Sequence, residues 1–163
     1  MSTGIAPYRA LIVSSARKRG IPPSVLAGVL QTESGFNPQA TGVNPGPPRS
    51  VDRGIAQINN VAYPQISNAE AYNPQFAIPY AAGILKSHYQ TCKTWTGALE
   101  AYNSGQCSGD TGYSSKVLAA SKKYVALDAS PHISSLSGAN WSSNRVLSLV
   151  LVVFALLLVV LAI

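Results

Sequence analysis

Apolar residues recur at helical spacing through most of the first 127 positions of the chain. Residues three or four positions apart share one face of a helix, so each such run predicts an amphipathic helix with its apolar face against a core. Glycine, proline and asparagine separate the runs. The pattern predicts helices over residues 6–19, 24–35, 73–89, 94–102 and 113–127.

Two stretches lack this pattern. Residues 35–53 are rich in Gly, Pro and Asn, which predicts an irregular loop. Residues 128–145 hold six serines together with Pro131 and Gly138, a composition typical of a tether. We therefore expect an all-α domain over residues 1–127 and a Ser-rich tether behind it.

The last 18 residues, 146–163, carry no charge and one polar side chain, Ser148. As a helix they would span about 27 Å at 1.5 Å per residue, close to the hydrocarbon thickness of a bilayer. Trp141 and Arg145 precede the run, where interfacial anchors are expected. A buried core helix is the alternative, but this run is apolar on all sides. We predict a C-terminal transmembrane helix that anchors the domain in a single pass.

The first 20 residues predict no secretory signal peptide, because their uninterrupted apolar run, residues 10–13, is too short for a signal core. The net charge of +6, with only six acidic residues, suits a polyanionic partner such as nucleic acid, anionic lipid or a cell wall. The charges are scattered and not grouped with aromatic residues, so specific nucleic-acid recognition is not expected.

The chain has two cysteines, Cys92 and Cys107. Neither His88 nor His132 lies at a spacing that would complete a zinc site, so neither a metal nor another cofactor is expected. In an oxidising compartment the two cysteines could form a disulfide. Two unrelated thiols remain the alternative.

Glu33 occupies an unusual position for a carboxylate. It lies on the same helical stripe as Leu26 and Leu30, so it projects towards the core near the negative end of the helix dipole. Burial and this dipole both disfavour the charged form and raise the pKa, which suits a general acid acting on a glycosidic oxygen. The alternatives are partial exposure on a fraying last turn, or a structural ion pair with Arg53.

Four segments in chain order resemble one family. They are Glu-Ser-Gly-Phe-Asn-Pro at 33–38, Gly-Ile-Ala-Gln-Ile-Asn at 54–59, the helical segment 73–85, and Ala-Leu-Glu-Ala-Tyr-Asn-Ser-Gly at 98–105 with residues 112–118 behind it. Their order and spacing closely resemble the soluble lytic transglycosylase domain, a relative of goose-type lysozyme, over roughly residues 5–125. The resemblance implies a lysozyme-like α-domain with a sugar-binding groove. It also implies cleavage of the β-1,4 bond between N-acetylmuramic acid and N-acetylglucosamine in the glycan strands of peptidoglycan.

The resemblance further implies that Glu33 is the lone catalytic acid/base. It would protonate the leaving oxygen and then remove the proton from the muramoyl 6-hydroxyl, which closes a 1,6-anhydro ring. We expect Tyr102 to orient Glu33 or the sugar, and Gln57 to offer an amide to an N-acetyl group or to Glu33. Trp95 we assign to the core. The expected substrate-binding residues are Ser34, Gln57, Tyr102, Asn103 and Tyr113.

A hydrolytic muramidase generally needs a second carboxylate opposite the acid. Asp52 is the serious contender, although it could instead be a loop residue paired with Arg53. Glu100 points away from the apolar face of its predicted helix, and Asp128 falls in the tether. The second motif has Ile55 and Ala56 where the family usually has Leu-Met, which affects the shape of the groove more than its chemistry.

Peptidoglycan lies outside the cytoplasmic membrane, whereas a tail-anchored domain without an export signal would face the cytosol. A phage particle resolves this conflict if the protein travels in the virion membrane or infection apparatus, with other virion proteins, and acts in the host periplasm. The other settings are an endolysin-like lysis enzyme and a conjugation or secretion machine. The non-enzymatic alternative is a wall-binding virion protein that has kept the fold.

Overall fold

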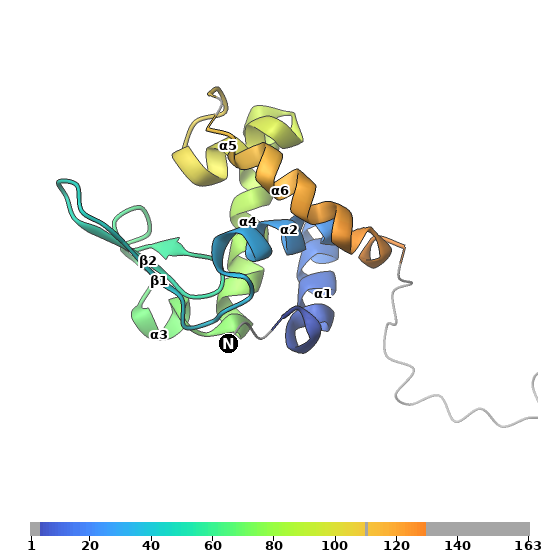
Figure 1. Cartoon of the computed structure of the whole chain (residues 1–163), viewed down its shortest axis with the longest axis horizontal. Coiled ribbons are helices and arrows are strands. Elements are labelled where there is room, and N and C mark those ends of the chain that lie inside the picture. Colours follow the sequence, from blue (N-terminus) through green and yellow to red (C-terminus); the bar gives the residue numbers. More distant parts are fainter. Residues whose placement is uncertain (1–3, 110, 130–163) are drawn as a thin grey trace, which may run out of the picture. The chain divides into compact units, whose positions relative to one another are not determined.

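The computed structural model describes residues 4–109 and 111–129, and helices make up most of this part of the chain (Figure 1). The predicted helical domain is therefore confirmed. The first predicted helix is divided into a 3-10 turn and α1, and the last into α6 and a second 3-10 segment. The helical elements are η1 Ala6–Tyr8, α1 Arg9–Arg19, α2 Pro23–Ser34, α3 Asn68–Ala71, α4 Pro74–Cys92, α5 Trp95–Ser104, α6 Tyr113–Ser121 and η2 Lys122–Leu127.

Helix α2 runs through the centre of the described domain and packs against α1, α6 and η2 (Figure 1). Every residue from Pro23 to Leu30 is buried, but the last turn, residues 31–34, is only partly buried. Helix α2 is thus anchored on all sides along its first two turns. Its C-terminal turn, which carries Glu33, emerges from the core.

Helices α2 and α6 approach each other closely at Gly28. A Cβ atom at this position would lie 2.2 Å from the Ser121 hydroxyl oxygen and 2.8 Å from the Val117 carbonyl oxygen. Only glycine lets the two helices meet at this separation, since a larger residue would push α6 away. This contact fixes α6 on α2 and so helps to bring Tyr113, the first residue of α6, to the C-terminal end of α2.

Residues 35–53 contain a β-hairpin, so the prediction of an irregular loop was wrong. Strands β1, Thr41–Asn44, and β2, Ser50–Arg53, pair antiparallel, and β3, Ile58–Asn59, joins the other edge of β2. The Pro- and Gly-rich residues that predicted a loop form the hairpin turn between β1 and β2. The strands are too short to show alternation in the sequence, and their stability depends on pairing with each other.

Asp128, near the end of the described residues, binds the start of α2. This carboxylate accepts hydrogen bonds from the backbone N–H of Ser24 at 2.8 Å and from its hydroxyl at 2.7 Å, which caps the first turn of α2. Asp128 therefore belongs to the domain and not to the predicted tether. The rest of the predicted tether, from residue 130 on, and the predicted transmembrane helix at 146–163 lie outside the described residues. None of the described helices is both long and apolar enough to span a bilayer.

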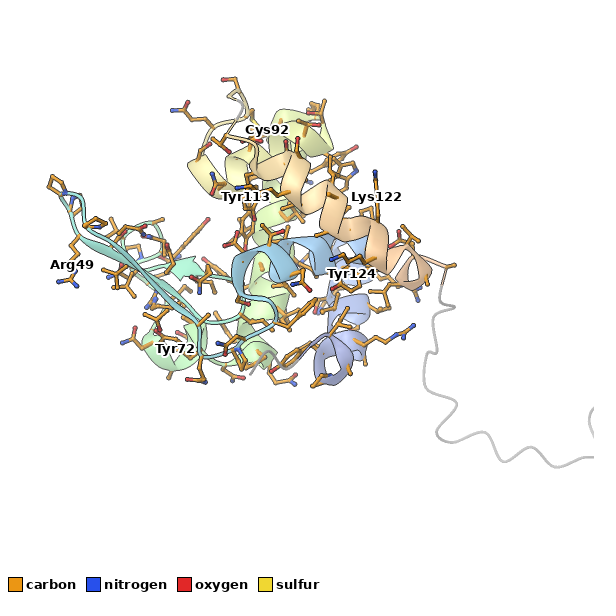
Figure 2. All side chains as sticks on the ribbon, viewed as in Figure 1. Arg49, Tyr72, Cys92, Tyr113, Lys122 and Tyr124 are labelled. Atoms are coloured by element: carbon orange, nitrogen blue, oxygen red, sulfur yellow. A yellow bond between two sulfur atoms is a disulfide. The ribbon has the colours of Figure 1, made fainter. Side chains whose placement is uncertain are left out.

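Cys92 and Cys107 form a disulfide, which answers the question that the sequence left open. It joins the C-terminal end of α4 to the segment between α5 and α6, and Figure 2 shows Cys92 at this end of the domain. Residues 105–109 of that segment are exposed, so the disulfide supplies a restraint that packing does not.

Candidate active site

A cleft of about 520 Å³ lies between the β-sheet, α4, α5 and the end of α2. Two of its lining residues, Glu33 and Asp52, are carboxylic acids, and the others are polar, aromatic or apolar. A concave site with a few convergent polar groups is where small molecules and sugars usually bind. The lining residues with polar or ionisable side chains are Glu33, Asn44, Asp52, Gln57, Asn59, Tyr63, His88, Tyr102, Asn103 and Ser104.

Glu33 is partly buried at the edge of the core, where its carboxyl group reaches the cleft. Its Oε1 accepts a hydrogen bond from the Tyr113 hydroxyl of α6. Burial raises the pKa of Glu33 from 4.5 to about 7; the Tyr113 hydrogen bond opposes this rise and the negative charge of Asp52 adds to it. Near neutral pH a large share of the molecules therefore carries Glu33 as a protonated acid.

Tyr113 and Tyr102 form an aromatic wall beside Glu33. Their rings are nearly parallel, at 7°, with centroids 6.5 Å apart. Burial is the main cause that raises the pKa of both hydroxyls, so each stays neutral and can donate a hydrogen bond. Figure 2 shows Tyr113 between the start of α6 and α2.

The tyrosine that contacts Glu33 is Tyr113, whereas Tyr102 was predicted to orient it. The Tyr102 hydroxyl donates instead to the Ala56 carbonyl oxygen at 3.1 Å, which ties α5 to the turn before β3. Tyr102 still lines the cleft, so it remains placed to meet a sugar.

Gln57 lines the cleft in a strained conformation, with a φ of 49° that non-glycine residues seldom adopt. Its Nε2 donates to the carbonyl oxygens of Gly54 at 2.8 Å and Ala40 at 3.2 Å. These bonds hold the turn between β2 and β3 and fix the side chain against the cleft wall. Strained residues that the surrounding structure holds in place are frequent at functional sites.

Ser34 and Asn103 differ in their relation to the cleft. The Ser34 hydroxyl lies 2.8 Å from the Ile55 carbonyl oxygen and 3.3 Å from that of Leu30, and Ser34 is absent from the cleft lining. It links the end of α2 to the β2–β3 turn. Asn103 is exposed, lines the cleft and contacts the Thr111 hydroxyl at 3.4 Å.

Asp52 projects from β2 into the same cleft as Glu33. Its two carboxylate oxygens accept hydrogen bonds from the side-chain amides of Asn44 at 2.8 Å and Asn59 at 2.7 Å. Asn59 is its partner across the β2–β3 ladder, so the sheet itself places this pair. The result is a carboxylate held in a fixed orientation.

The sequence left open an ion pair of Arg53 with Asp52 or with Glu33. Within the described part of the chain, Arg53 forms neither pair. The guanidinium group is buried and donates to the carbonyl oxygens of Ile58 at 3.1 Å and Ile66 at 3.0 Å, and to the Asn68 side chain at 2.9 Å. Arg53 therefore braces the loop behind β3.

Glu100 and Trp95 both lie on α5, and the structure bears on the interpretation of each. Glu100 was predicted to point away from the apolar face of α5, but it is only 2% exposed and contacts the segment that leads into α6. Trp95 was assigned to the core; it is half-buried, packs against the core cluster and stacks on Tyr89 with centroids 4.3 Å apart. Periodicity on α5 alone could not reveal the neighbour that covers Glu100.

The sequence profile of the Transglycosylase SLT domain family matches residues 10–122, which is more than half of the chain. The chain belongs to this family, whose members are lytic transglycosylases that act on peptidoglycan. The matched range holds the Glu33 turn, the β-sheet, Tyr102 and Tyr113. A search of curated proteins found no match. Among residues 4–109 and 111–129, no group of three or more His, Cys, Asp or Glu side chains is arranged to hold a metal ion.

Proposed function

We propose that this chain is a lytic transglycosylase that cleaves the β-1,4 bond between N-acetylmuramic acid and N-acetylglucosamine and leaves a 1,6-anhydro-muramoyl end. The observation that carries the proposal is Glu33: a cleft carboxyl group with its pKa raised to about 7 and one oxygen held by Tyr113. A group with a pKa near the working pH can serve both as a general acid and as a general base.

The reaction needs both roles from Glu33. The protonated acid gives its proton to the glycosidic oxygen while the bond from that oxygen to C1 of the muramoyl sugar breaks. The resulting carboxylate then takes the proton of the C6 hydroxyl as that oxygen bonds to C1. The acid is restored, no water is consumed, and no cofactor is required.

The neighbours of Glu33 support this cycle. Since the Tyr113 hydroxyl donates to Oε1, the carboxyl group is held with Oε2 available for the proton transfers. Tyr102, Gln57 and Asn103 line the cleft and are proposed to bind the glycan. Ser34 lies behind the cleft wall, and we propose that it acts by fixing the end of α2.

A hydrolytic muramidase is the second candidate, because Asp52 lies in the same cleft as Glu33. A carboxylate on the other side of the sugar could activate water. Mass spectrometry of digested cell walls separates the two reactions. Anhydro-muramoyl ends support the transglycosylase. Reducing muramic acid ends that are formed by the wild type and lost in Asp52→Asn would show that the enzyme is a muramidase instead.

Zymography with Glu33→Gln separates both enzymes from a non-catalytic wall-binding protein. Glutamine keeps the shape and the hydrogen-bond acceptor but cannot transfer a proton, so clearing of the wall should be lost. Equal clearing by both forms would remove Glu33 from the mechanism. Binding to insoluble wall without any clearing by the wild type would favour the wall-binding alternative.

The biological setting remains a prediction from the sequence. We propose that residues 146–163 anchor the enzyme to a membrane and that it opens the host wall locally during delivery of a phage genome. Detection of the protein in purified virions supports this setting, and detection only in host envelopes would contradict it.

A further inference from the structure

Glu100 holds the start of α6 with a buried carboxylate. Its Oε2 accepts the Thr111 hydroxyl at 2.6 Å and the Thr111 backbone N–H at 3.3 Å, and its Oε1 accepts the Ser114 backbone N–H at 3.0 Å. These hydrogen bonds lower the pKa of Glu100 to about 2, with the Thr111 hydroxyl as the largest cause. Glu100 is therefore ionised throughout the neutral pH range.

The N-terminus of α6 requires such a partner from outside the helix. Its N-cap residue is Gly112, which has no side chain to accept a hydrogen bond from the first turn. Glu100 reaches across from α5 and accepts the N–H of Ser114, the second residue of α6. A negative charge at this end of a helix is also favoured by the helix dipole.

Tyr113 lies between the two residues that Glu100 binds. Its backbone N–H points to the Thr111 hydroxyl at 3.3 Å, and its own hydroxyl donates to Glu33. Residues 103–109 before it are exposed, and the disulfide at Cys107 lies four positions before Thr111. The contacts of Glu100 therefore lie on both sides of Tyr113 and help to fix where its side chain starts.

We propose that Glu100 is a positioning residue: by holding residues 111–114 it fixes the Tyr113 hydroxyl against the Glu33 carboxyl. This inference rests on the proposed function, in which Glu33 is the acid/base. It assigns to Glu100 a role that acts through Tyr113, at a position that reaches neither the cleft nor the substrate.

Several other ionisable groups face Glu33. Asp52 approaches from β2, Tyr102 from α5 and Tyr113 from α6, and His88 of α4 lines the same cleft. Of these, only Tyr113 is also next to Glu100. Its hydrogen bond lowers the pKa of Glu33 against the effect of burial, so losing that bond should raise the pKa of Glu33 further.

The test is a ¹³C NMR titration of the glutamate carboxyl groups in the full chain. The chain has three glutamates, Glu33, Glu70 and Glu100, so Glu33→Gln assigns the signal of interest directly. In Tyr113→Phe the pKa of Glu33 should rise. Glu100→Gln should shift it in the same direction, and should add nothing in the Tyr113→Phe background.

Thr111 provides a milder variant if Glu100→Gln does not fold. Thr111→Val keeps the shape but removes the hydroxyl that binds Glu100, whereas Thr111→Ser keeps the hydroxyl and serves as the matched control. We expect Thr111→Val, but not Thr111→Ser, to raise the pKa of Glu33 and to lower kcat about tenfold, with KM nearly unchanged, as for a misplaced catalytic group.

An unchanged Glu33 pKa in folded Glu100→Gln, or in Thr111→Val if Glu100→Gln does not fold, would overturn the inference. The inference would also be overturned if the shifts in the pKa of Glu33 caused by Glu100→Gln and Tyr113→Phe were additive in the double variant. The titration does not depend on turnover, so it is separate from the proposed function. If Glu33→Gln clears walls as well as the wild type, the catalytic role fails while the contact between Glu100 and Tyr113 can still be established.

Discussion

Glu33 at the end of α2 and Glu100 within α5 are two carboxyl groups whose pKa values move in opposite directions. The pKa of Glu33 rises to about 7, whereas that of Glu100 falls to about 2. Glu33 accepts a hydrogen bond from Tyr113 and faces the negative charge of Asp52. Glu100 receives three hydrogen bonds at the N-terminus of a helix. The number of donors, more than burial, therefore decides whether a carboxyl group here is an acid or a permanent anion.

The largest test of this comparison is Glu33→Gln. We expect wall digestion to fall by about 10²- to 10⁴-fold, the usual contribution of a general acid. The control is Glu70→Gln, in the exposed capping box of α3, where glutamine retains the capping interaction. Activity of Glu33→Gln near the wild-type level would contradict the assignment of Glu33 as the acid.

At alkaline pH, Glu33→Gln should be more stable than the wild type. The pKa of Glu33 is higher in the folded state than its ordinary 4.5, so its stabilising contribution is complete below about 4.5 and is lost as pH rises through about 7. Glutamine mimics the neutral acid at every pH. In thermal melts, Tm should therefore fall less between pH 5 and pH 8.5 for Glu33→Gln than for the wild type.

The disulfide is the second restraint on the segment that Glu100 holds. Replacing both cysteines in Cys92→Ser/Cys107→Ser should lower the free energy of unfolding by about 3 kcal/mol, as expected for a loop of this length. Denaturant titration measures the loss, with the wild type under reducing conditions as the matched comparison. If Glu100 fixes Tyr113 by itself, the pKa of Glu33 in the folded variant should stay where it is.

Ionised Glu100, unlike Glu33, should contribute to folding stability that is lost at acidic pH. Its pKa in the folded state is lower than the ordinary 4.5, so its contribution is present above about 4.5 and is lost as pH falls towards about 2. Glu100→Gln should be less stable than the wild type at pH 7, and the difference should narrow below pH 4. Equal stability of both proteins at pH 7 would mean that the buried carboxylate does not hold α6.

The smallest expected effect comes from Asp52→Asn. Because the charge of Asp52 raises the pKa of Glu33, its removal should move the alkaline limb of the pH–rate profile to lower pH. For a transglycosylase the products should keep their anhydro ends and kcat should change little. An upward shift of the limb would show that loss of the Asn44 and Asn59 contacts outweighs the loss of charge.

Much of the helical framework could be predicted from the sequence, because apolar periodicity and turn residues are local signals. The α2 stripe, the Asn73 and Pro74 start of α4 and the glycine after α2 all lie where expected. The sheet could not be predicted, since its strands have two to four residues and are stabilised by pairing across the hairpin. For the same reason Asp128, which caps α2 from 104 residues away, was placed in the tether.

By itself the sequence determined the family and the residue with an unusual pKa, because motif order and helical phase are written along the chain. Only the tertiary structure decided which side chains surround that residue. It brought Tyr113 to Glu33 across 80 positions, placed Asp52 in the same cleft and covered Glu100 with the start of α6. Hydrogen bonds and burial between distant segments set the charge of each carboxyl group, and neither can be read from one helix alone.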